Sequence, residues 1–176
     1  MYQGMLNPGR GLMLSVDMMQ YLPEEFKLVF VGDGPLKVAT MAYVKKNMLN
    51  ERVKFFGSVP NHELAEYTKA ADIGLMPLNT DKRSMGKSGF KLLQSMGLGI
   101  VSIGQNITIN NEIIEHNVNS YLVSNISDWE RILIKVLEKD TDFQKLGNNA
   151  RQRIISRYTF IANYLCFSPL NSRTKL

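Results

Sequence analysis

The sequence predicts an α/β fold of the Rossmann-like kind, a three-layer sandwich in which helices cover both faces of a parallel sheet of about six strands. Short runs of β-branched or aromatic residues alternate with helical stretches of about ten residues. Strands joined through helices need crossover connections, which favour parallel pairing. With 176 residues, 44% of them hydrophobic, the chain is long enough for one well-buried core and too short for two large ones.

The first two strands are expected at Tyr2–Leu6 and Lys27–Val31. The first is a stub with a helix behind it over Gly9–Gln20. The second (KLVFV) is a short apolar run typical of a buried strand. The turn Gly32-Asp33-Gly34-Pro35 follows, and because proline suits the first turn of a helix, we expect a helix from there to about Met48.

The middle of the chain supplies two more strands, Arg52–Phe56 (RVKFF) and Asp72–Met76 (DIGLM). Between them the chain turns at Gly57-Ser58-Val59-Pro60. Asn61 is expected to cap a helix from His62 to about Ala71.

The segment Gly86 to Val101 (GKSGFKLLQSMGLGIV) is the most informative part of the sequence. A glycine-flanked loop leads into a short amphipathic helix and then into an apolar strand, expected at Gly99–Ile103. This order places a helix N-terminus at the carboxyl edge of the sheet, where α/β proteins hold phosphates. Lys87 and Lys91 add positive charge near that end. The segment predicts an anionic ligand, with a nucleotide as the first expectation.

The C-terminal third is expected to hold a short helix, a last strand and a long helical region. Asn110 or Asn111 caps the short helix, which ends at Glu115, and Ser120–Val123 (SYLV) is the strand. Ser127 to about Tyr158 is expected to be helical, because apolar residues recur on one face. These are Trp129, Ile132, Leu133, Val136 and Leu137. We expect one domain over residues 1–160 and a loosely structured tail over 161–176.

Composition narrows the class of protein. Twenty-one Lys and Arg against sixteen Asp and Glu give a formal charge of +5, which fits a phosphate-bearing ligand, an acidic membrane surface or simply a mild basic excess. The basic residues are dispersed, which argues against nucleic acid as the ligand.

Cys166 is the only cysteine, so a reducing compartment is expected. No apolar run approaches a membrane span and the first residues lack the cationic-then-apolar pattern of a signal peptide, so we expect a cytoplasmic protein.

Six segments between Tyr2 and Val123 carry a resemblance to a known family. They are Tyr2-Gln3-Gly4 with Gly9-Arg10-Gly11-Leu12, Val31–Pro35 (VGDGP), Val53–Val59 (VKFFGSV), Leu64–Pro77 (LAEYTKAADIGLMP), Gly86–Gly99, and Asn111–Ile114 with Asn119–Val123. None is specific alone. Together they resemble the carboxyl-terminal, donor-binding domain of retaining glycosyltransferases of the family 4 type, enzymes with two Rossmann-like halves facing a cleft (the GT-B fold).

The resemblance implies a site for the diphosphate of a nucleotide sugar. Arg10 in the first loop and Lys87 at the helix start are the cations this sequence offers. A guanidinium fork matches phosphate oxygens, whereas an ammonium acts as a point charge. Both would also stabilise the diphosphate as it leaves with its negative charge. The alternative for both residues is solvated surface charge.

The resemblance assigns further residues to the donor site by their place in the motifs. The backbone of Gly57, Ser58 and Val59 would border the nucleobase, with a plain strand-to-helix turn as the alternative. Backbone N–H groups would face phosphate at four positions of the loop and helix. These are Ser88, Gly89, Phe90 and Leu93.

Gln94 and Glu112 complete the candidate set. The family carries two glutamates at positions that are Gly86 and Gln94 here. An amide at Gln94 can still hydrogen-bond the ribose hydroxyls, without the stronger bonds of a carboxylate. Glu112 matches an acidic residue of the family, and a contact with the helix dipole is its alternative. Gly86, and Met5 where the family has its first cation, leave the donor-sugar contact and the catalytic residues unassigned.

The resemblance implies that no metal or other cofactor is needed. His62 and His116 lie far apart in sequence without a Cys or acidic cluster at ligand spacing. A structural zinc site is therefore not expected.

These observations predict the donor-binding half of a retaining glycosyltransferase, which moves a sugar from a UDP- or GDP-linked donor to a glycan or glycolipid in cell-surface polysaccharide synthesis. The resemblance implies an amino-terminal acceptor-binding domain that we expect to lie outside this chain or to be encoded separately, and the chain alone is therefore expected to be inactive. A peripheral contact with the inner face of the membrane is a further expectation. One alternative is a non-catalytic nucleotide-binding or subunit-interaction domain derived from this fold. Another is an NAD-binding domain, although Gly32-Asp33-Gly34-Pro35 is not a GxGxxG.

Overall fold

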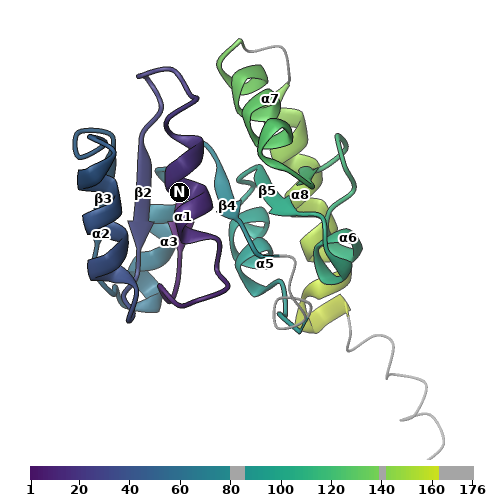
Figure 1. Ribbon diagram of the computed structural model, residues 1–176. Coiled ribbons are helices and arrows are strands. Elements are labelled where there is room, and N and C mark those ends of the chain that lie inside the picture. The colour runs from purple at the N-terminus through teal and green to yellow at the C-terminus, as the bar shows by residue number, and fades with distance from the viewer. Residues whose placement is uncertain (80–85, 139–141, 163–176) are drawn as a thin grey trace, which may run out of the picture.

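The computed structural model describes residues 1–79, 86–138 and 142–162 and confirms the Rossmann-like α/β fold (Figure 1). One sheet of six parallel strands runs in the order β3-β2-β1-β4-β5-β6. The strands are β1 (Tyr2–Gln3), β2 (Leu28–Val31), β3 (Val53–Phe56), β4 (Gly74–Met76), β5 (Ser102–Gln105) and β6 (Tyr121–Val123). The order reverses between β1 and β4, and doubly wound α/β proteins bind ligands at such a reversal.

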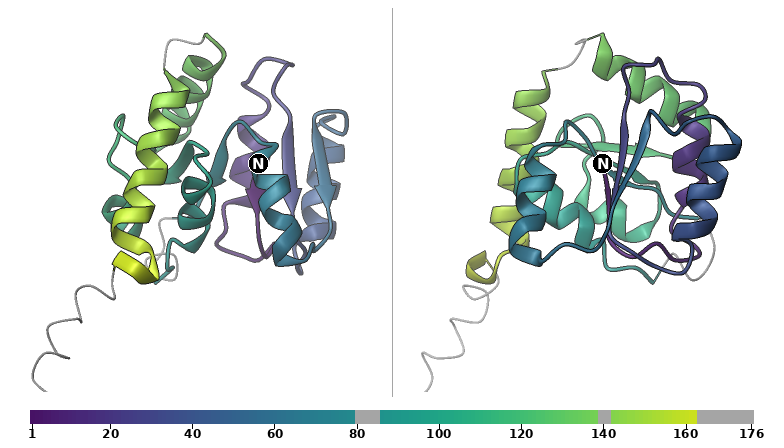
Figure 2. Two further views of the ribbon diagram at one scale, coloured as in Figure 1. Left: turned by 180° about the vertical axis from the view of Figure 1, so that it is seen from behind. Right: turned by 90° about the vertical axis from the view of Figure 1, so that its left-hand side faces the viewer.

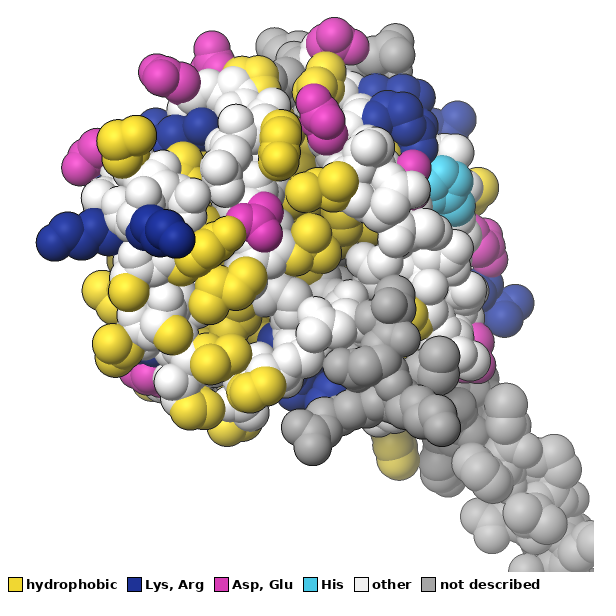
Figure 3. Space-filling view, in the orientation of Figure 1, with side chains coloured by type: hydrophobic (Ala, Val, Ile, Leu, Met, Phe, Trp, Pro, Cys, Tyr) yellow, Lys and Arg dark blue, Asp and Glu magenta, His cyan; other side chains and the backbone are white. Residues whose placement is uncertain are grey.

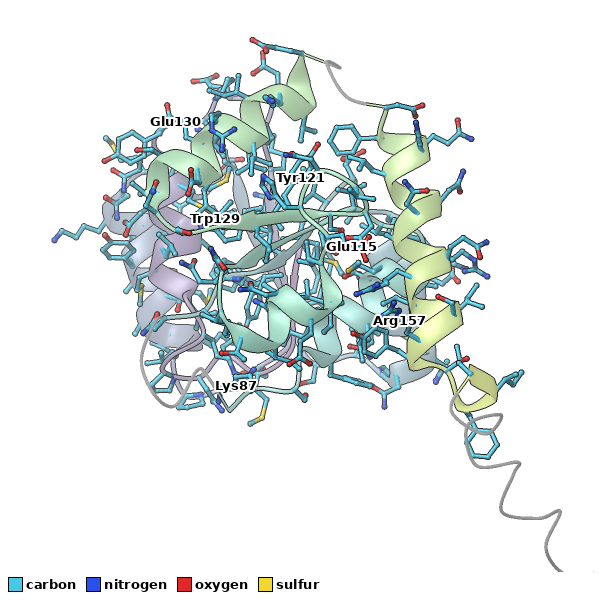
Figure 4. The ribbon with its side chains drawn as sticks, turned by 90° about the vertical axis from the view of Figure 1, so that its right-hand side faces the viewer. Lys87, Glu115, Tyr121, Trp129, Glu130 and Arg157 are labelled. Atoms are coloured by element: carbon cyan, nitrogen blue, oxygen red, sulfur yellow. The ribbon has the colours of Figure 1, made fainter. Side chains whose placement is uncertain are left out.

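Helices cover both faces of the sheet, which gives the expected three layers (Figure 2). One layer holds α1 (Leu12–Met18), α2 (Lys37–Lys46) and α7 (Ile126–Leu137). The opposite layer holds α3 (Asn61–Lys69), α5 (Phe90–Gly97) and α8 (Phe143–Tyr158). The short helix α6 (Thr108–Ile113) connects β5 to β6. The fully buried indole of Trp129 on α7 belongs to the hydrophobic cluster between the first layer and the sheet (Figure 4).

Several expected element ends differ from the structure. Asn61 does not cap α3 but is its first residue, and Pro60 holds the cap position without a side-chain bond. Neither expected asparagine caps α6, because that helix begins earlier, at Thr108. The side chain of Asn110 instead donates to the carbonyl oxygen of Gln105 at 2.7 Å. This bond ties α6 to the end of β5.

Other differences concern lengths. The first strand and its helix are shorter than expected, and β5 starts at Ser102 because the turn after α5 extends through Gly99, which has a φ of 81°. The expected continuous helix from Ser127 is two helices, and Asp142 caps the second by accepting from the backbone N–H of Lys145 at 2.9 Å. The expected tail lies outside the described residues from 163 onward, and the boundary at residue 160 stays a prediction.

Within the described ranges, no helix has the length and apolar character needed to span a bilayer. Exposed hydrophobic side chains nevertheless gather on the surface of the layer that contains α1 and α2 (Figure 3). Val38 is 78% exposed, Met41 46% and Met48, just beyond α2, 89%. Contiguous apolar surface of this kind often contacts a partner.

Arg52 ties the start of β3 to the segment between α1 and β2. Its guanidinium donates to the carbonyl oxygens of Met19 (2.8 Å), Leu22 (2.9 Å), Pro23 (2.6 Å) and Phe26 (3.3 Å). These bonds hold a connection that has no regular structure of its own. Hydrogen bonds that involve a charged group contribute more than neutral ones.

Arg52→Met is therefore expected to lower the free energy of unfolding by about 2 kcal/mol, because it leaves several carbonyl oxygens without their donor. Urea unfolding measures this loss. Lys54→Met, two residues along the chain, is the control, because Lys54 is 55% exposed and its contacts are local, a pair with Glu51 at 3.7 Å and a bond to the Asn50 carbonyl oxygen at 3.1 Å. Equal stability of the two variants would show that the Arg52 bonds contribute little.

Candidate functional site

A cleft of about 480 Å³ opens at the carboxyl ends of β1 and β4, where the strand order reverses. It is lined by Gln3, Gly4, Met5, Arg10, Asn61, Leu64, Met76, Gly86, Lys87, Ser88, Gly89, Phe90, Lys91 and Gln94. The structure thus brings together six of the residues proposed from the sequence: Arg10, Lys87, Ser88, Gly89, Phe90 and Gln94. Figure 4 shows Lys87 at the lower edge of the molecule, well away from Trp129 in the core.

The glycine before α5 allows that helix to start at the cleft. Gly89 holds the N-cap position with a φ of 66°, a conformation that favours glycine. It also packs so closely against Ile113 that a Cβ at this position would collide with the Ile113 side chain. α5 therefore begins at Phe90 and not at Lys87, and Lys87 lies in the loop that precedes the helix. The backbone N–H groups of Leu92 and Leu93 already donate to the Gly89 carbonyl oxygen. Phe90 and Lys91, the first two residues of α5, line the cleft. The N–H groups of such early helix residues can bind an anion.

Arg10 contributes a cation from the loop between β1 and α1. Its Nε atom is buried and has no hydrogen-bond partner among the described residues. Leaving a guanidinium nitrogen buried without an acceptor costs free energy. Arg10 as a whole lines the cleft, where a guanidinium group can donate to an anion.

Lys91 was noted in the sequence only as added charge, and the structure gives it a defined place. Its Nζ atom donates to the hydroxyl oxygen of Tyr2 at 2.9 Å and lies 4.2 Å from the centre of the Tyr2 ring. Burial, helped by the charges of Arg10 and Lys87, lowers the pKa of Lys91 from 10.5 to about 7. The nearby tyrosine, 89 positions away in the sequence, gives no local signal for this contact.

The side chain of Gln94 is held in place by the buried side-chain amide of Gln3. The Nε2 atom of Gln3 donates to Gln94 Oε1 at 3.4 Å, and Gln3 Oε1 accepts from the hydroxyl of Thr68 at 2.9 Å. Gln3 is only 4% exposed. This chain of bonds joins α3, β1 and α5 and orients the Gln94 side chain at the cleft.

The remaining sequence candidates are not among the residues that line the cleft. Gly57, Ser58 and Val59 form the loop after β3. Leu93 lies on α5, and its backbone N–H donates to the Gly89 carbonyl oxygen at 3.3 Å, not into the cleft as expected from the sequence. Glu112 is exposed on α6, and its backbone carbonyl accepts from Arg153 and Tyr158 of α8. Their roles toward a nucleotide stay predictions.

The charge of the cleft has one sign. Two cationic side chains, Arg10 and Lys87, line it together with the basic side chain of Lys91, and no acidic side chain is among the described residues of its wall. Within residues 1–79, 86–138 and 142–162 there is also no group of three His, Cys, Asp or Glu side chains that could hold a metal ion. This wall is therefore suited to an anion.

The family model for glycosyl transferases group 1 matches residues 1–153 of the chain. The chain belongs to this family. The glycosyltransferase domain is also 30% identical, over 134 residues, to the N-acetyl-alpha-D-glucosaminyl L-malate synthase of Bacillus anthracis. That match covers 75% of this chain and 33% of the relative, so the domain spans about a third of the relative's length.

Solved structures show the same fold. Alr3699/HepE of Anabaena, crystallised in complex with UDP, superposes with a TM-score of 0.85 and 19% identity, covering 97% of this chain and 48% of that one. The C-terminal domain of a glycosyl transferase group 1 family protein (LpcC) from Francisella tularensis superposes with a TM-score of 0.74 and 17% identity, covering 90% and 86%. The glycosyltransferase domain thus has the Rossmann-like architecture of a GT-B half.

The low pKa of Lys91 makes the stability of this glycosyltransferase domain depend on pH. Between the folded pKa of about 7 and the ordinary value of 10.5, the unfolded chain binds more protons than the folded one, so the free energy of unfolding rises with pH. The free-energy cost of burying the charged amine of Lys91 is fully present below pH 7 and is lost as the pH approaches 10.5. Lys91→Met removes this cost.

We therefore expect Lys91→Met to raise the melting temperature most at pH 6, and this gain to shrink steadily towards pH 10. Thermal unfolding followed by circular dichroism measures the difference between variant and wild type at each pH. Lys69→Met is the control, because Lys69 is 54% exposed on α3 and pairs with Glu66. A gain that does not change with pH would contradict the prediction.

Proposed function

We propose that the chain is the donor-binding half of a retaining glycosyltransferase that uses a nucleotide-diphosphate sugar. The observation that carries the proposal is the cleft at the strand-order reversal, with three basic side chains and no described acid in its wall. HepE was crystallised with UDP, which favours UDP as the nucleotide. A UDP-linked sugar is therefore proposed as the donor.

The proposed roles follow from the chemistry of the cleft. Arg10 supplies a planar donor group for two phosphate oxygens, and Lys87 a point charge. The N–H groups of Phe90 and Lys91, at the start of α5, bring the positive end of the helix dipole to the same anion. As the bond to the sugar breaks, negative charge accumulates on the diphosphate, and these donors stabilise it. Gln94, fixed by Gln3, is proposed to hydrogen-bond the ribose.

The acceptor half is proposed to lie across the cleft from this chain. Transfer needs both substrates in near-attack geometry, and these residues supply one wall. Two hydrophobic side chains at the cleft are exposed, Met5 at 58% and Phe90 at 60%, and a second domain that closes the cleft would cover them. The chain alone is then expected to bind a donor weakly and to transfer little sugar.

Several finer expectations remain predictions. They are independence of metal ions, a glycan or glycolipid acceptor in cell-surface polysaccharide synthesis, a cytoplasmic location and a peripheral contact with the inner face of a membrane. None of them is needed for the donor site to bind a nucleotide. Nucleotide binding is therefore the property to test first.

The test is a thermal-shift and calorimetric screen of the chain against UDP, GDP, ADP and NAD. Stabilisation by UDP, at lower concentration than by the other three, is the expected result. A response to NAD alone would replace the proposal with an NAD-binding domain. No response to any nucleotide would refute donor binding.

A second candidate function is a non-catalytic domain that contacts another subunit. It is favoured by Gly86, which stands in place of a glutamate of the family, and by the exposed hydrophobic side chains of α2 described above. Sedimentation velocity separates the two ideas. A self-associating chain that ignores all four nucleotides supports this candidate.

A further inference from the structure

We propose that Lys91 is a third ligand of the diphosphate, and that its amine takes up a proton from solution when the diphosphate binds. The inference rests on the proposed function, since it concerns the same cleft. It adds a residue that the family resemblance does not assign. It also adds a property, proton uptake, that can be measured in the absence of any acceptor.

The geometry places the Lys91 amine at the cleft. Lys91 is the second residue of α5, and its side chain crosses the face of the Tyr2 ring, with Nζ 4.2 Å from the ring centre. One bond of the amine is directed to the Tyr2 hydroxyl at 2.9 Å. An ammonium group has three N–H donors, so two remain for phosphate oxygens in the cleft that Lys91 lines together with Arg10 and Lys87.

No negative charge in the described structure balances the ammonium form. From β1 it faces the neutral Tyr2, whose own pKa is raised by burial. The preceding loops contribute Arg10 and Lys87, which are both cationic. The neighbouring wall residues of α3 and β4 are Asn61, Leu64 and Met76, none of which titrates. The empty cleft therefore favours the neutral amine.

A bound diphosphate reverses this balance. A carboxylate or phosphate within a few ångströms favours the charged form of a lysine, as any opposite charge does. The neutral amine then gains one proton from water or buffer and becomes an ammonium that donates to a phosphate oxygen. No other bond forms or breaks. Each Lys91 that was neutral takes up one proton, so the charge of the complex rises by one.

The alternative is that Lys91 only packs against Tyr2. Its stem buries apolar surface, and the contact of an ammonium with an aromatic face is itself stabilising. Lys91→Met keeps an unbranched side chain on the ring but cannot be protonated. Lys91→Arg keeps a charge that does not titrate in this range. These two variants distinguish packing, charge and proton uptake.

The experiment is calorimetric titration of UDP into the chain at pH 8 in HEPES and in Tris, two buffers with different ionisation enthalpies. Wild type is expected to show net proton uptake, and its Kd for UDP to rise by up to about tenfold per pH unit above pH 7.5. Proton uptake cannot come from UDP itself. Its terminal phosphate titrates near pH 6, and nearby cations would make that phosphate release protons. Lys91→Met and Lys91→Arg should show no uptake. Lys69→Met should behave as wild type.

The outcomes separate the inference from the proposed function. UDP binding with equal heats in both buffers, or uptake that persists in Lys91→Met, would overturn the role of Lys91 and leave the donor site standing. If neither UDP nor inorganic pyrophosphate binds to wild type, both fall. Circular dichroism checks that each variant is folded. If Lys91→Met is not folded, the comparison of Lys91→Arg with wild type provides the test.

Discussion

Arg10→Ala is expected to weaken UDP binding by roughly 10- to 100-fold, because charge-assisted hydrogen bonds contribute about 1.5–3 kcal/mol each and 1.4 kcal/mol corresponds to a factor of ten. The effect should be large because Arg10 lines the cleft and carries a full positive charge there. Calorimetric titration of wild type and variant measures the change.

Arg131→Ala is the matched control for this prediction. Arg131 lies on α7, is 56% exposed and reaches Asp128 only at 3.5 Å. It has the same side chain and the same charge, so a general effect of net charge on an anionic ligand would appear in both variants. Equal losses of affinity would show that Arg10 acts through the overall field and does not contact the ligand.

Gly147→Ala is expected to lower the free energy of unfolding by about 3 kcal/mol, the upper end of what overpacking costs. Gly147 lies on α8, and a Cβ there would collide with the carbonyl oxygen of Gly99. Because the obstacle is backbone, no side chain can rotate away, so α8 must move from the turn that follows α5. For a chain of this size the melting temperature should fall by about 10 °C. The loss should appear although alanine is the better helix former by about 1 kcal/mol.

Gly57→Ala provides the control. A Cβ at Gly57 meets nothing within 4 Å, so the variant should unfold within about 0.5 kcal/mol of wild type. Chemical denaturation of both proteins tests the pair. A stable Gly147→Ala variant would mean that α8 is packed less tightly than the structure shows. UDP affinity of Gly57→Ala also tests the predicted nucleobase contact, independently of stability.

The fold was largely predictable because its signals are local. Strands such as β2 and β3 are short apolar runs of neighbouring residues, and the turn at Gly32–Pro35 separates strand from helix in a few positions. Element ends were less predictable. Asn61 has the chemistry of a cap, but the backbone turns one residue earlier, at Pro60. A residue that favours the cap position indicates where a helix tends to start, but the backbone path decides where it does start.

The candidate site was predictable in part. Arg10 and Lys87 follow from the family pattern, and both line the cleft. The place of Lys91 was missed, because its amine is set by Tyr2 on a strand 89 positions earlier. The support of Gln94 by Gln3 was missed for the same reason, with a separation of 91 positions.

The sequence by itself determined a parallel α/β domain and a loop and helix able to hold an anion. It also determined the order of the six segments that carry the family resemblance. These depend on periodicity and spacing between near neighbours in the chain. Only the tertiary structure decided that Lys91 is buried over Tyr2 and that Gln3 holds Gln94. Both contacts arise because β1 lies beside β4 and α5 packs over this part of the sheet. Solvent exclusion and the local electric field depend on such long-range neighbours, and a lysine's pKa changes only once they are in place.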